Sequence, residues 1–449
     1  MAKRASKVEE GRPKGILQSF AARGRSMLTL IRGASDAGTP LRAIGELAVE
    51  LLSPRGETGG STIARDLLAL YDGLSLSDRI AFLNLLADSY GPDQAAIDRA
   101  IEAYRDAPSG RSIAALRTAT DSRCQQLIRR INLADNGTLA LIRMREDALR
   151  AQSEIRNFES LDADFSHVFT PWFNIGFLDL RQMAWDSPAK VLHKIIAYEA
   201  VHEVHGWDDL RRRVEPDDRR CYAFFHPRMP EEPLIFVEVA LTREIPSSIA
   251  SLLDEHRQPT TARGATTAVF YSISNCQEGL RGIPFGNVLI KRVVELLSHE
   301  LPMLKTFVTL SPVPAFAPWL KTQMSDDQSV LPPAGRAALA GIDADGWTAA
   351  TATTAERDAM IVAAARYFIE ARTAHGKVVN SVARFHLGNG AQLERINWLG
   401  DTSPRGLRSA HGLMVNYLYD PRKIDQNVKR FNELTDVAVN AEVKRLLRT

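Results

Sequence analysis

The sequence is poor in the residues that build disulfide frameworks and zinc sites. Its 449 residues contain three cysteines, at the widely separated positions 124, 221 and 276. An odd number without paired spacing indicates neither a disulfide scaffold nor a zinc site. The simplest compartment for such a chain is a reducing cytosol, so we expect a cytoplasmic protein.

The sequence also lacks long hydrophobic runs and an excess of charge. No apolar run approaches the roughly 20 residues of a membrane span. The charged N-terminal segment has no apolar stretch of a secretory signal after it, and the last three residues are not a peroxisomal SKL tail. A net charge of +2 argues against a nucleic-acid-binding surface over the whole molecule. We therefore expect neither a membrane nor a nucleic acid as partner.

The length of the chain predicts two or three domains, and 45% hydrophobic residues predict a folded protein. Residues 1–13 are charged and nearly free of apolar residues, which indicates a disordered tail. Helical periodicity dominates 14–167, and we expect this segment to pack and to contact other subunits. Residues 168–449 are richer in strand patterns and form the predicted catalytic domain, with a polar, alanine-rich helical insertion at 321–376.

A strand, loop, helix and second strand follow one another in the middle of this second domain. Thr267 to Ser274 is β-branched and aromatic and predicts a strand. Asn287 is a good N-cap for the helical pattern after it, which Pro302 ends. Lys305 to Leu310 predicts the second strand. Strands joined through a helix are typically parallel, so we expect a parallel pair.

The loop between the first strand and this helix is rich in glycine. Gly279, Gly282 and Gly286 let the backbone approach a ligand, the helix start offers free N–H groups, and Arg281 adds a positive charge. A pyrophosphate fits this pattern. An ordinary tight turn explains it as well, since the loop matches neither the dinucleotide-binding nor the P-loop motif.

Two further stretches predict secondary structure around this unit. Pro233 to Thr242 is a continuous apolar strand pattern, which gives a mixed sheet of at least three strands. The aromatic segment from Pro171 to Trp185 is strand-like, and Ser187 to Val204 follows helical spacing.

Glu199, His202 and His205 raise the question of a metal site. The zinc motif HExxH needs histidines four residues apart, whereas the spacing here is HExH. On a helix the two histidines would lie about one turn apart, but no third convergent ligand is visible. We expect structural histidines and no metal.

His386 stands at the end of an apolar run, directly before the Gly388-Asn389-Gly390 turn. A histidine at an element end beside a tight turn is well placed to act as a general acid. A hydrogen-bonded structural histidine is the alternative.

Several long motifs, in order, resemble the malonyl-CoA decarboxylase family. The resemblance runs from about residue 170 to Tyr419 and extends weakly to the segment DRIAFLNLLADSYGPD in the helical part. Its motifs are FHPRMPEEPLIFVEVALT, FYSIS, GLRGIPFGNVLIK, TLSPVPAFAPWL, VARFHLGNGA, INWLGD and GLMVNYLY.

The resemblance implies an α+β protein with an all-α N-terminal oligomerisation domain followed by a GNAT (N-acetyltransferase)-like catalytic domain with a mixed sheet. It implies a carboxy-lyase of malonate and fatty acid metabolism that converts malonyl-CoA to acetyl-CoA and CO2. It also suggests a homotetramer built as a dimer of dimers. No metal, biotin or nicotinamide is expected, since the thioester is the electron sink.

By motif position, the resemblance also assigns site residues. The catalytic serine of the family falls on Ser311 and its histidine on His386, and Ser272 and Tyr419 match further active-site positions. The family gives the serine a proton-acceptor role, but a serine without an activating base is a weak acceptor, so we favour a positioning role. The loop that would bind the CoA phosphates comprises Arg281, Gly282, Ile283, Pro284, Phe285, Gly286 and Asn287. Some relatives carry an acidic residue where this chain has Pro284, so that residue's role does not carry over.

The residue types fit the chemistry of decarboxylation. Loss of CO2 leaves an enolate, so the site must orient the carboxylate, stabilise an oxyanion and deliver a proton to carbon. Ser311 can hold an oxygen, His386 can supply the proton, and Tyr419 and Ser272 can orient them. Three alternatives remain: a GNAT-type acyl-CoA-dependent acyltransferase, a non-catalytic acyl-CoA sensor, and a metal hydrolase that uses His202 and His205.

Overall fold

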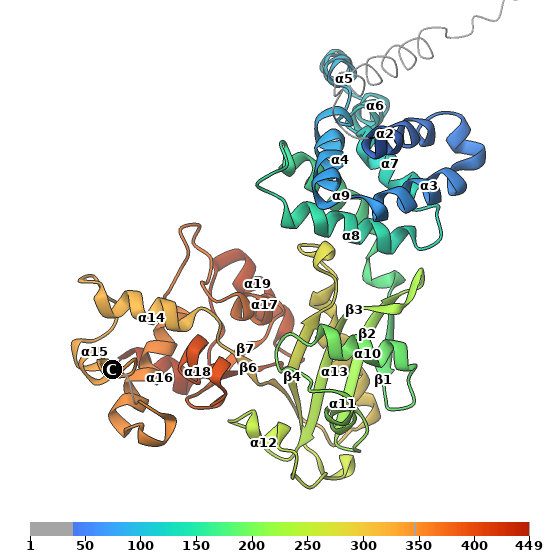
Figure 1. The fold of residues 1–449 in the computed structure, drawn as a ribbon. Coiled ribbons are helices and arrows are strands. Elements are labelled where there is room, and N and C mark those ends of the chain that lie inside the picture. The colour runs from blue at the N-terminus through green and yellow to red at the C-terminus, as the bar shows by residue number, and fades with distance from the viewer. Residues whose placement is uncertain (1–38, 345–346, 449) are drawn as a thin grey trace, which may run out of the picture. The chain divides into compact units, whose positions relative to one another are not determined.

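The computed structural model describes residues 39–344 and 347–448. The predicted tail 1–13 lies outside these residues. The chain forms two compact units (Figure 1). The first takes the described residues up to Asn174 together with Gln277–Ile283, and the second takes Ile175–Cys276 and the chain from Pro284 on. Within the described residues, no helix is both long and apolar enough to cross a membrane.

The first unit is helical, as its periodicity predicts. Its core consists of apolar side chains that repeat at helical spacing, such as Ile44, Ala48 and Leu51 along one face of α2. Its helices are α2 (Thr39–Leu51), α3 (Arg55–Gly73), α4 (Leu76–Ser89), α5 (Gln94–Asp106), α6 (Gly110–Ala119), α7 (Arg123–Ile131), α8 (Gly137–Arg150), α9 (Phe158–Trp172) and the 3-10 turn η3 (Glu278–Leu280). The predicted boundary after residue 167 falls inside α9.

The second unit is built on a mixed sheet with the strand order β1-β2-β3-β4-β5-β8-β6, in which β7 also pairs with β8. Only the β4–β5 pair of this sheet is parallel among the described strands, and the strand, helix and strand unit predicted the pair. The strands are β1 (Asp179–Met183), β2 (Arg219–His226), β3 (Met229–Thr242), β4 (Thr267–Asn275), β5 (Thr306–Thr309), β6 (Ser311–Pro312), β7 (Gln392–Asn397) and β8 (Met414–Leu418).

Helices cover this sheet and extend beyond it. The α-helices are α10 (Ala189–Tyr198), α11 (Trp207–Val214), α12 (Ala250–Leu253), α13 (Leu289–Glu300), α14 (Phe316–Ser325), α15 (Pro333–Leu339), α16 (Thr354–Ile369), α17 (Ser381–Gly388), α18 (Pro404–Ala410), α19 (Ile424–Leu434) and α20 (Ala441–Arg445). Short 3-10 turns are η1 (Ile175–Phe177), η2 (Ala262–Gly264), η4 (Gly286–Val288), η5 (Ala349–Thr351) and η6 (Leu446–Arg448). Both α15 and α16 lie in the predicted helical segment 321–376.

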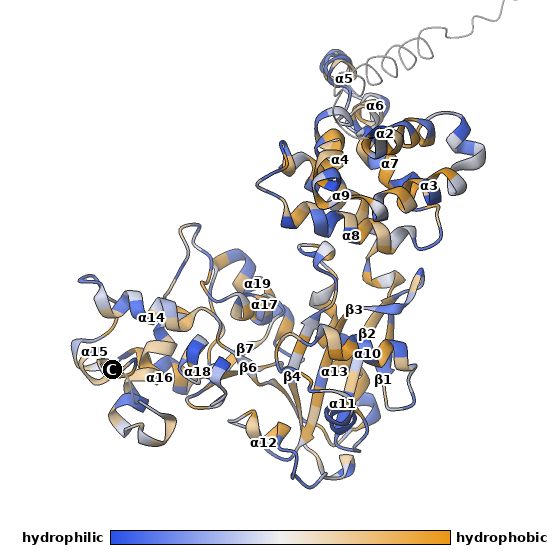
Figure 2. Ribbon diagram, viewed as in Figure 1, coloured by the Kyte–Doolittle hydropathy of each residue, from blue (hydrophilic) through white to orange (hydrophobic). Residues whose placement is uncertain are grey.

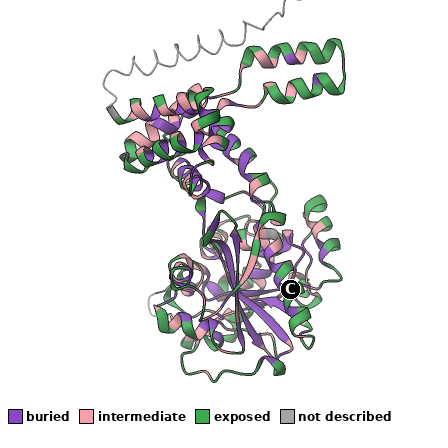
Figure 3. Ribbon diagram, turned by 90° about the vertical axis from the view of Figure 1, so that its right-hand side faces the viewer, coloured by how far each residue is buried: buried purple, intermediate pink, exposed green. Residues whose placement is uncertain are grey.

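The two faces of the sheet bury different helices. Ile195 of α10 and Leu210 of α11 share a core with Ala223 of β2. The neighbouring Tyr222 has its hydroxyl 3.4 Å from the carboxylate of Glu300, at the end of α13. Successive strand residues point to opposite faces, so α13 covers the face opposite α10 and α11. The strands are hydrophobic (Figure 2) and buried along most of their length (Figure 3). The fold is therefore the predicted α+β arrangement, a helical unit followed by a mixed-sheet unit.

Three local predictions were wrong in their bounds. The helix predicted for Ser187–Val204 ends at Tyr198, because Glu199 takes an extended conformation (φ −64°, ψ 111°). The strand predicted from Pro171 is confined to β1, since the residues before it finish α9 and form η1. Asn287 is not the N-cap of α13. It lies inside the 3-10 turn η4, in which Leu289 N–H bonds to the Gly286 carbonyl, and the N-cap is Val288.

Candidate active site

The site lies where β4 and β5 part. The two strands pair from Thr267 and Thr306 as far as Phe270 and Thr309. Beyond this point β4 continues to Asn275, whereas the segment after β5 forms β6, which pairs with β8. A cavity of about 280 Å³ opens beside the separated strands.

Two of the four residues that the resemblance assigned as catalytic line this cavity, and a third contacts one of them. Ser311 is the first residue of β6 and His386 lies in the last turn of α17, and both line the cavity. His386 Nε2 is 3.3 Å from Ser311 Oγ. Its other ring nitrogen, Nδ1, is 2.8 Å from the hydroxyl of Tyr419, which directly follows β8. The three side chains form one buried chain of hydrogen bonds.

Local structure fixes α17, and with it His386, next to Ser311. Asn380 caps α17 by accepting a hydrogen bond from Ala383 N–H at 2.7 Å. The amide of the same side chain donates to the carbonyl of Pro314 at 2.9 Å, three residues after Ser311. One buried asparagine thus ties the helix of the histidine to the strand of the serine.

Burial makes His386 a weak base. The residue is 3% exposed, and this desolvation lowers the pKa of its imidazole from 6.5 to about 3. The ring of Tyr417 stacks on it with centroids 4.7 Å apart. In the described part of the chain no carboxylate contacts the ring, so the imidazole is neutral at working pH.

The hydroxyl of Ser311 also belongs to a second hydrogen-bond network, on the side of Thr309. Its hydroxyl donates to Thr309 Oγ1 at 2.9 Å. Thr309 Oγ1 also accepts from Tyr417 N–H at 3.1 Å, and Asn416 Nδ2 donates to the Thr309 carbonyl at 2.8 Å. Thr309 is therefore held rigidly, and it holds the serine hydroxyl in turn.

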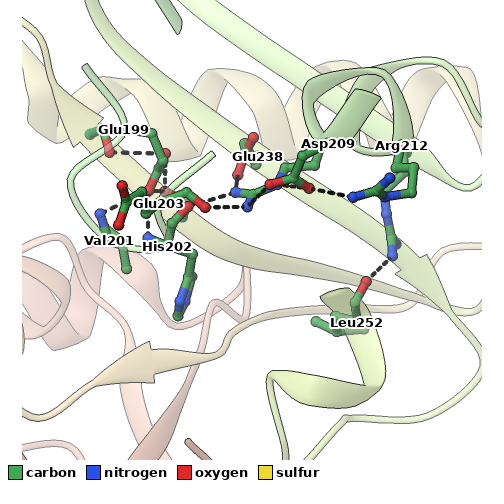
Figure 4. A network of polar contacts seen from close by, with 12 residues as sticks. Glu199, Val201, His202, Glu203, Asp209, Arg212, Glu238 and Leu252 are labelled. Carbon is green, nitrogen blue, oxygen red and sulfur yellow. Dashed lines mark hydrogen bonds and ion pairs between the residues drawn. The ribbon is translucent and has the colours of Figure 1, made fainter. Parts of the chain in front are cut away.

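Ser272 does not join this group. Its hydroxyl donates to both carboxylate oxygens of Glu199, each at 2.7 Å. The two residues on either side of it, Tyr271 and Ile273, line the cavity instead. Glu199 belongs to a wider buried polar network with Glu238 (Figure 4).

The first half of the predicted CoA loop packs within the helical unit. Arg281 and Gly282 are exposed and Ile283 is buried, and Gly282 has the left-handed φ of +85° that favours glycine. Arg145 of α8, 3% exposed in its side chain, donates to the carbonyls of Gly279 at 2.8 Å and Arg281 at 2.9 Å.

The second half of this loop belongs to the sheet unit and reaches the cavity wall. Pro284 is exposed, Phe285 is buried and Asn287 lies in η4. A Cβ added at Gly286 would lie 3.9 Å from the ring of Phe385, which lines the cavity. The second half of the loop is thus close to the cavity at Gly286.

The histidines considered for a metal lie in the loop after α10, not on a helix. His202 is half-buried, and desolvation lowers its pKa to about 4, whereas His205 is exposed. Among the described residues, no three His, Cys, Asp or Glu side chains gather in a way that could hold a metal ion.

Sequence reasoning missed Thr309, Tyr417 and the role of Glu199. Thr309 lies two residues before Ser311, and alternate residues of an extended segment share a face. The sequence therefore could have predicted that the two side chains lie together. The side-chain partners of Glu199, Ser272 and Ser274, are more than 70 residues away in the chain, and no local pattern indicates them.

The comparisons with known proteins agree on one family. A model described as the malonyl-CoA decarboxylase C-terminal domain matches residues 176–449, and one described as the N-terminal domain matches residues 90–173. The mitochondrial malonyl-CoA decarboxylase of Anser anser anser is 33% identical over 434 residues, 86% of each chain.

Solved structures give the same result. The malonyl-CoA decarboxylase structure from Agrobacterium vitis is 50% identical, with a TM-score of 0.86 over 90% of this chain and 99% of that one. The one from Rhodopseudomonas palustris is 48% identical, with a TM-score of 0.84 over the same shares. On its sequence, its two family domains and its fold, this chain belongs to the malonyl-CoA decarboxylase family.

Proposed function

We propose that this protein is a carboxy-lyase that converts malonyl-CoA to acetyl-CoA and CO2. The observation that carries the proposal is the buried Ser311–His386–Tyr419 chain of hydrogen bonds at a cavity between two diverging strands. The names of the relatives point to the same substrate. The reaction breaks the bond between the methylene and the carboxylate, and the electron pair moves into the thioester as an enolate. A proton then forms the new C–H bond.

His386 has the tautomer that such a proton donor needs. In the described part of the chain, the Tyr419 hydroxyl bonds only to His386 Nδ1. Burial raises the pKa of this phenol well above its usual range, so it stays protonated and donates to Nδ1. The imidazole proton therefore sits on Nε2, the nitrogen that faces Ser311 and the cavity. A neutral imidazole N–H would thus face the reacting carbon. The thioester enolate is a strong enough base to take its proton, which leaves an imidazolate that a proton from solvent restores to the neutral ring.

Ser311 acts by position in this mechanism. Its neighbour Nε2 carries a proton and cannot accept one, and its other partner, Thr309, is a hydroxyl. The serine therefore has no base to ionise it. We infer that its O–H turns from Thr309 to an oxygen of the substrate, where it stabilises the growing negative charge.

The coenzyme end of the substrate fits the loop and the start of α13. The backbone at Gly286 passes close to Phe385, and the helical segment that starts there with η4 and continues as α13 would present the N–H groups at its start to an anion. No metal, biotin or nicotinamide takes part in this proposal, because the thioester accepts the electron pair. Binding by Arg281 to the CoA phosphates stays a prediction.

The proposal also includes a homotetramer in the cytoplasm. The resemblance to the family is what supports this part of the proposal. The three cysteines are buried free thiols, as suits a reducing compartment. Light scattering coupled to gel filtration tests the oligomer, and a monomer would contradict it.

The experiment that tests the activity follows CO2 and acetyl-CoA after purified protein is mixed with malonyl-CoA. We expect turnover by the wild type and a loss of about 100-fold or more in His386→Ala and in Ser311→Ala. His375→Ala, which removes an exposed histidine, is the matched control. Acyl transfer to an added amine without release of CO2 would establish the acyltransferase instead.

A further inference from the structure

One wall of the cavity comes from a loop rather than from the sheet. The loop Glu199–Gly206 follows α10, and its Val201 lines the same cavity as Ser311 and His386. The side chain is half-buried and apolar. Any acyl group that contacts Ser311 and His386 therefore shares this small space with Val201.

The carboxylate of Glu199 is the main tie between this loop and β4, beside a hydrogen bond from Ala200 N–H to Ser274 Oγ at 3.2 Å. Glu199 Oε1 accepts hydrogen bonds from Val201 N–H and His202 N–H, each at 2.8 Å. Both of its oxygens accept from Ser272 Oγ at 2.7 Å, and Oε2 also accepts from Ser274 Oγ at 3.2 Å. An ionised carboxylate only accepts, so all these donors converge on it. The carboxylate thus joins the backbone of the loop to two side chains of one strand.

The carbonyl groups of the loop are fixed from the other side. Arg405 donates to the carbonyl of Ala200 at 3.0 Å. Arg213, 4% exposed, donates to the carbonyls of His202 at 2.7 Å and Glu203 at 2.8 Å (Figure 4). Four consecutive residues of the loop are therefore bound through their backbone, and the wall at Val201 is rigid. A β-branched side chain adds stiffness, because it has few accessible rotamers.

We propose that Val201 is a specificity-determining residue that restricts the site to an unbranched malonyl group, with Glu199 and Ser272 as the residues that position it. The proposal rests on the decarboxylase function proposed above. The carbon that loses CO2 must lie within reach of His386. A methyl branch on that carbon therefore adds volume in a cavity of about 280 Å³, and the backbone hydrogen bonds of the loop keep Val201 from moving away. This assigns to Ser272 a role through Glu199 rather than through Ser311.

The test compares malonyl-CoA with methylmalonyl-CoA as substrates. Its readout is the ratio of kcat/KM for the branched substrate to kcat/KM for the unbranched one. One methyl group in an apolar pocket is typically worth a factor of about 10 or more, so we expect Val201→Ala to raise this ratio at least about tenfold. Val201→Ile adds a methyl group to the wall and should lower the ratio.

Two variants with opposite expected signs keep this test decisive if one of them folds poorly. An unchanged ratio in a folded Val201→Ala or Val201→Ile protein would overturn the proposal. A wild type that uses both substrates equally well would overturn it too. Equal losses on both substrates, with the ratio constant, would show that Val201 is a packing residue only.

The positioning role of Glu199 has its own readout. Glu199→Ala frees the loop and should shift the substrate ratio in the same direction as Val201→Ala. Glu199→Gln keeps one acceptor oxygen for the two N–H groups and should restore the wild-type ratio. Glu203→Ala removes an exposed carboxylate of the same loop and should leave the ratio unchanged. The same ratio in Glu199→Ala and in the wild type would remove Glu199 from the proposal.

The failure of this inference differs from the failure of the proposed function. A wild type that releases no CO2 from malonyl-CoA contradicts the function itself. A wild type that turns over malonyl-CoA, with substrate ratios that none of these variants alters, contradicts only the assignment of Val201 and Glu199.

Discussion

His386 Nδ1 lies 2.8 Å from the hydroxyl oxygen of Tyr419, and both groups are buried. In the described part of the chain, this ring nitrogen is the only hydrogen-bond partner of the phenol, so the phenol O–H donates to it. The contact therefore determines which nitrogen of His386 faces the cavity with a proton. In the proposed mechanism Tyr419 would act on the reaction through the tautomer of the histidine, without contact to the reacting atoms.

The first prediction concerns this contact. Tyr419→Phe removes the donor to Nδ1, so the imidazole proton can move to the wrong nitrogen. We expect kcat for CO2 release to fall about 10- to 100-fold with little change in KM, because the tautomer matters for proton transfer and not for binding. Steady-state kinetics with malonyl-CoA measures both constants.

Tyr417→Phe is the matched control for this variant. Tyr417 stacks on His386, but its hydroxyl has no hydrogen-bond partner among the described residues. The substitution keeps the stacked ring and removes an unused hydroxyl, so activity should be nearly unchanged. An equal loss in both variants would show that packing, and not the hydrogen bond to Nδ1, is what matters.

The second prediction follows from the low pKa of His386. Burial lowers this pKa to about 3, so the imidazole is already neutral well below neutral pH. Its protonation state then does not change between about pH 5.5 and 7.5, and kcat/KM should show no acid limb in this window. A pH profile with an inflection near 6.5 that disappears in His386→Gln would mean that the ring is solvated in the working enzyme.

The third prediction uses the buried carboxyl of Glu238 in β3. Burial, reinforced by the nearby Glu199 carboxylate, raises the pKa of Glu238 from 4.5 to about 8, although Arg213 lies 3.3 Å away. Arg213 is also paired with Asp209, and Glu238 Oε1 has no partner in the described part of the chain. We therefore expect Glu238 to be protonated at neutral pH.

The effect on stability has a definite sign. The folded-state pKa is above the unfolded one, so the folded protein binds an extra proton between about pH 4.5 and 8, and stability decreases as pH rises through this window. Glu238→Gln removes this dependence. Relative to wild type it should gain about 3 kcal/mol in unfolding free energy from pH 5.5 to 8, as measured by urea unfolding. Parallel pH dependences of the two proteins would contradict the assignment.

The order of elements around the site was predictable because local patterns encode it. The β-branched run at Thr267–Ser274 and the helix before Pro302 leave few arrangements other than a parallel pair. The end of α10 was not predictable in this way. Apolar residues continue at helical spacing beyond Tyr198. However, the Glu199 carboxylate hydrogen-bonds to Ser272 and Ser274, and these contacts replace a further turn of the helix.

The same difference between local patterns and long-range contacts applies to the residues of the site. Ser311 and His386 stand in long motifs, so the resemblance could single them out, and in the structure both line one cavity. Neither a motif nor a periodicity says that Ser272 faces Glu199, because that depends on which face of β4 each residue takes. Tyr271 is an extra residue in the pairing of β3 with β4, where Val239 is opposite Phe270 and Glu238 opposite Ser272. Such a bulge changes the facing of all later residues in the strand and leaves little trace in the sequence.

The fourth prediction concerns Arg145, which holds the segment before the predicted CoA loop. Its buried guanidinium bonds to Asp162 and to the carbonyls of Gly279 and Arg281, so Arg145→Met leaves these acceptors without their donor. We expect a loss of about 2 to 4 kcal/mol in the stability of the helical unit and a higher KM for malonyl-CoA, because the loop is no longer held in one conformation. Urea unfolding and steady-state kinetics measure the two effects. Arg143→Met, at an exposed position of the same helix, should change neither, and a wild-type KM in a destabilised Arg145→Met protein would separate this segment from CoA binding.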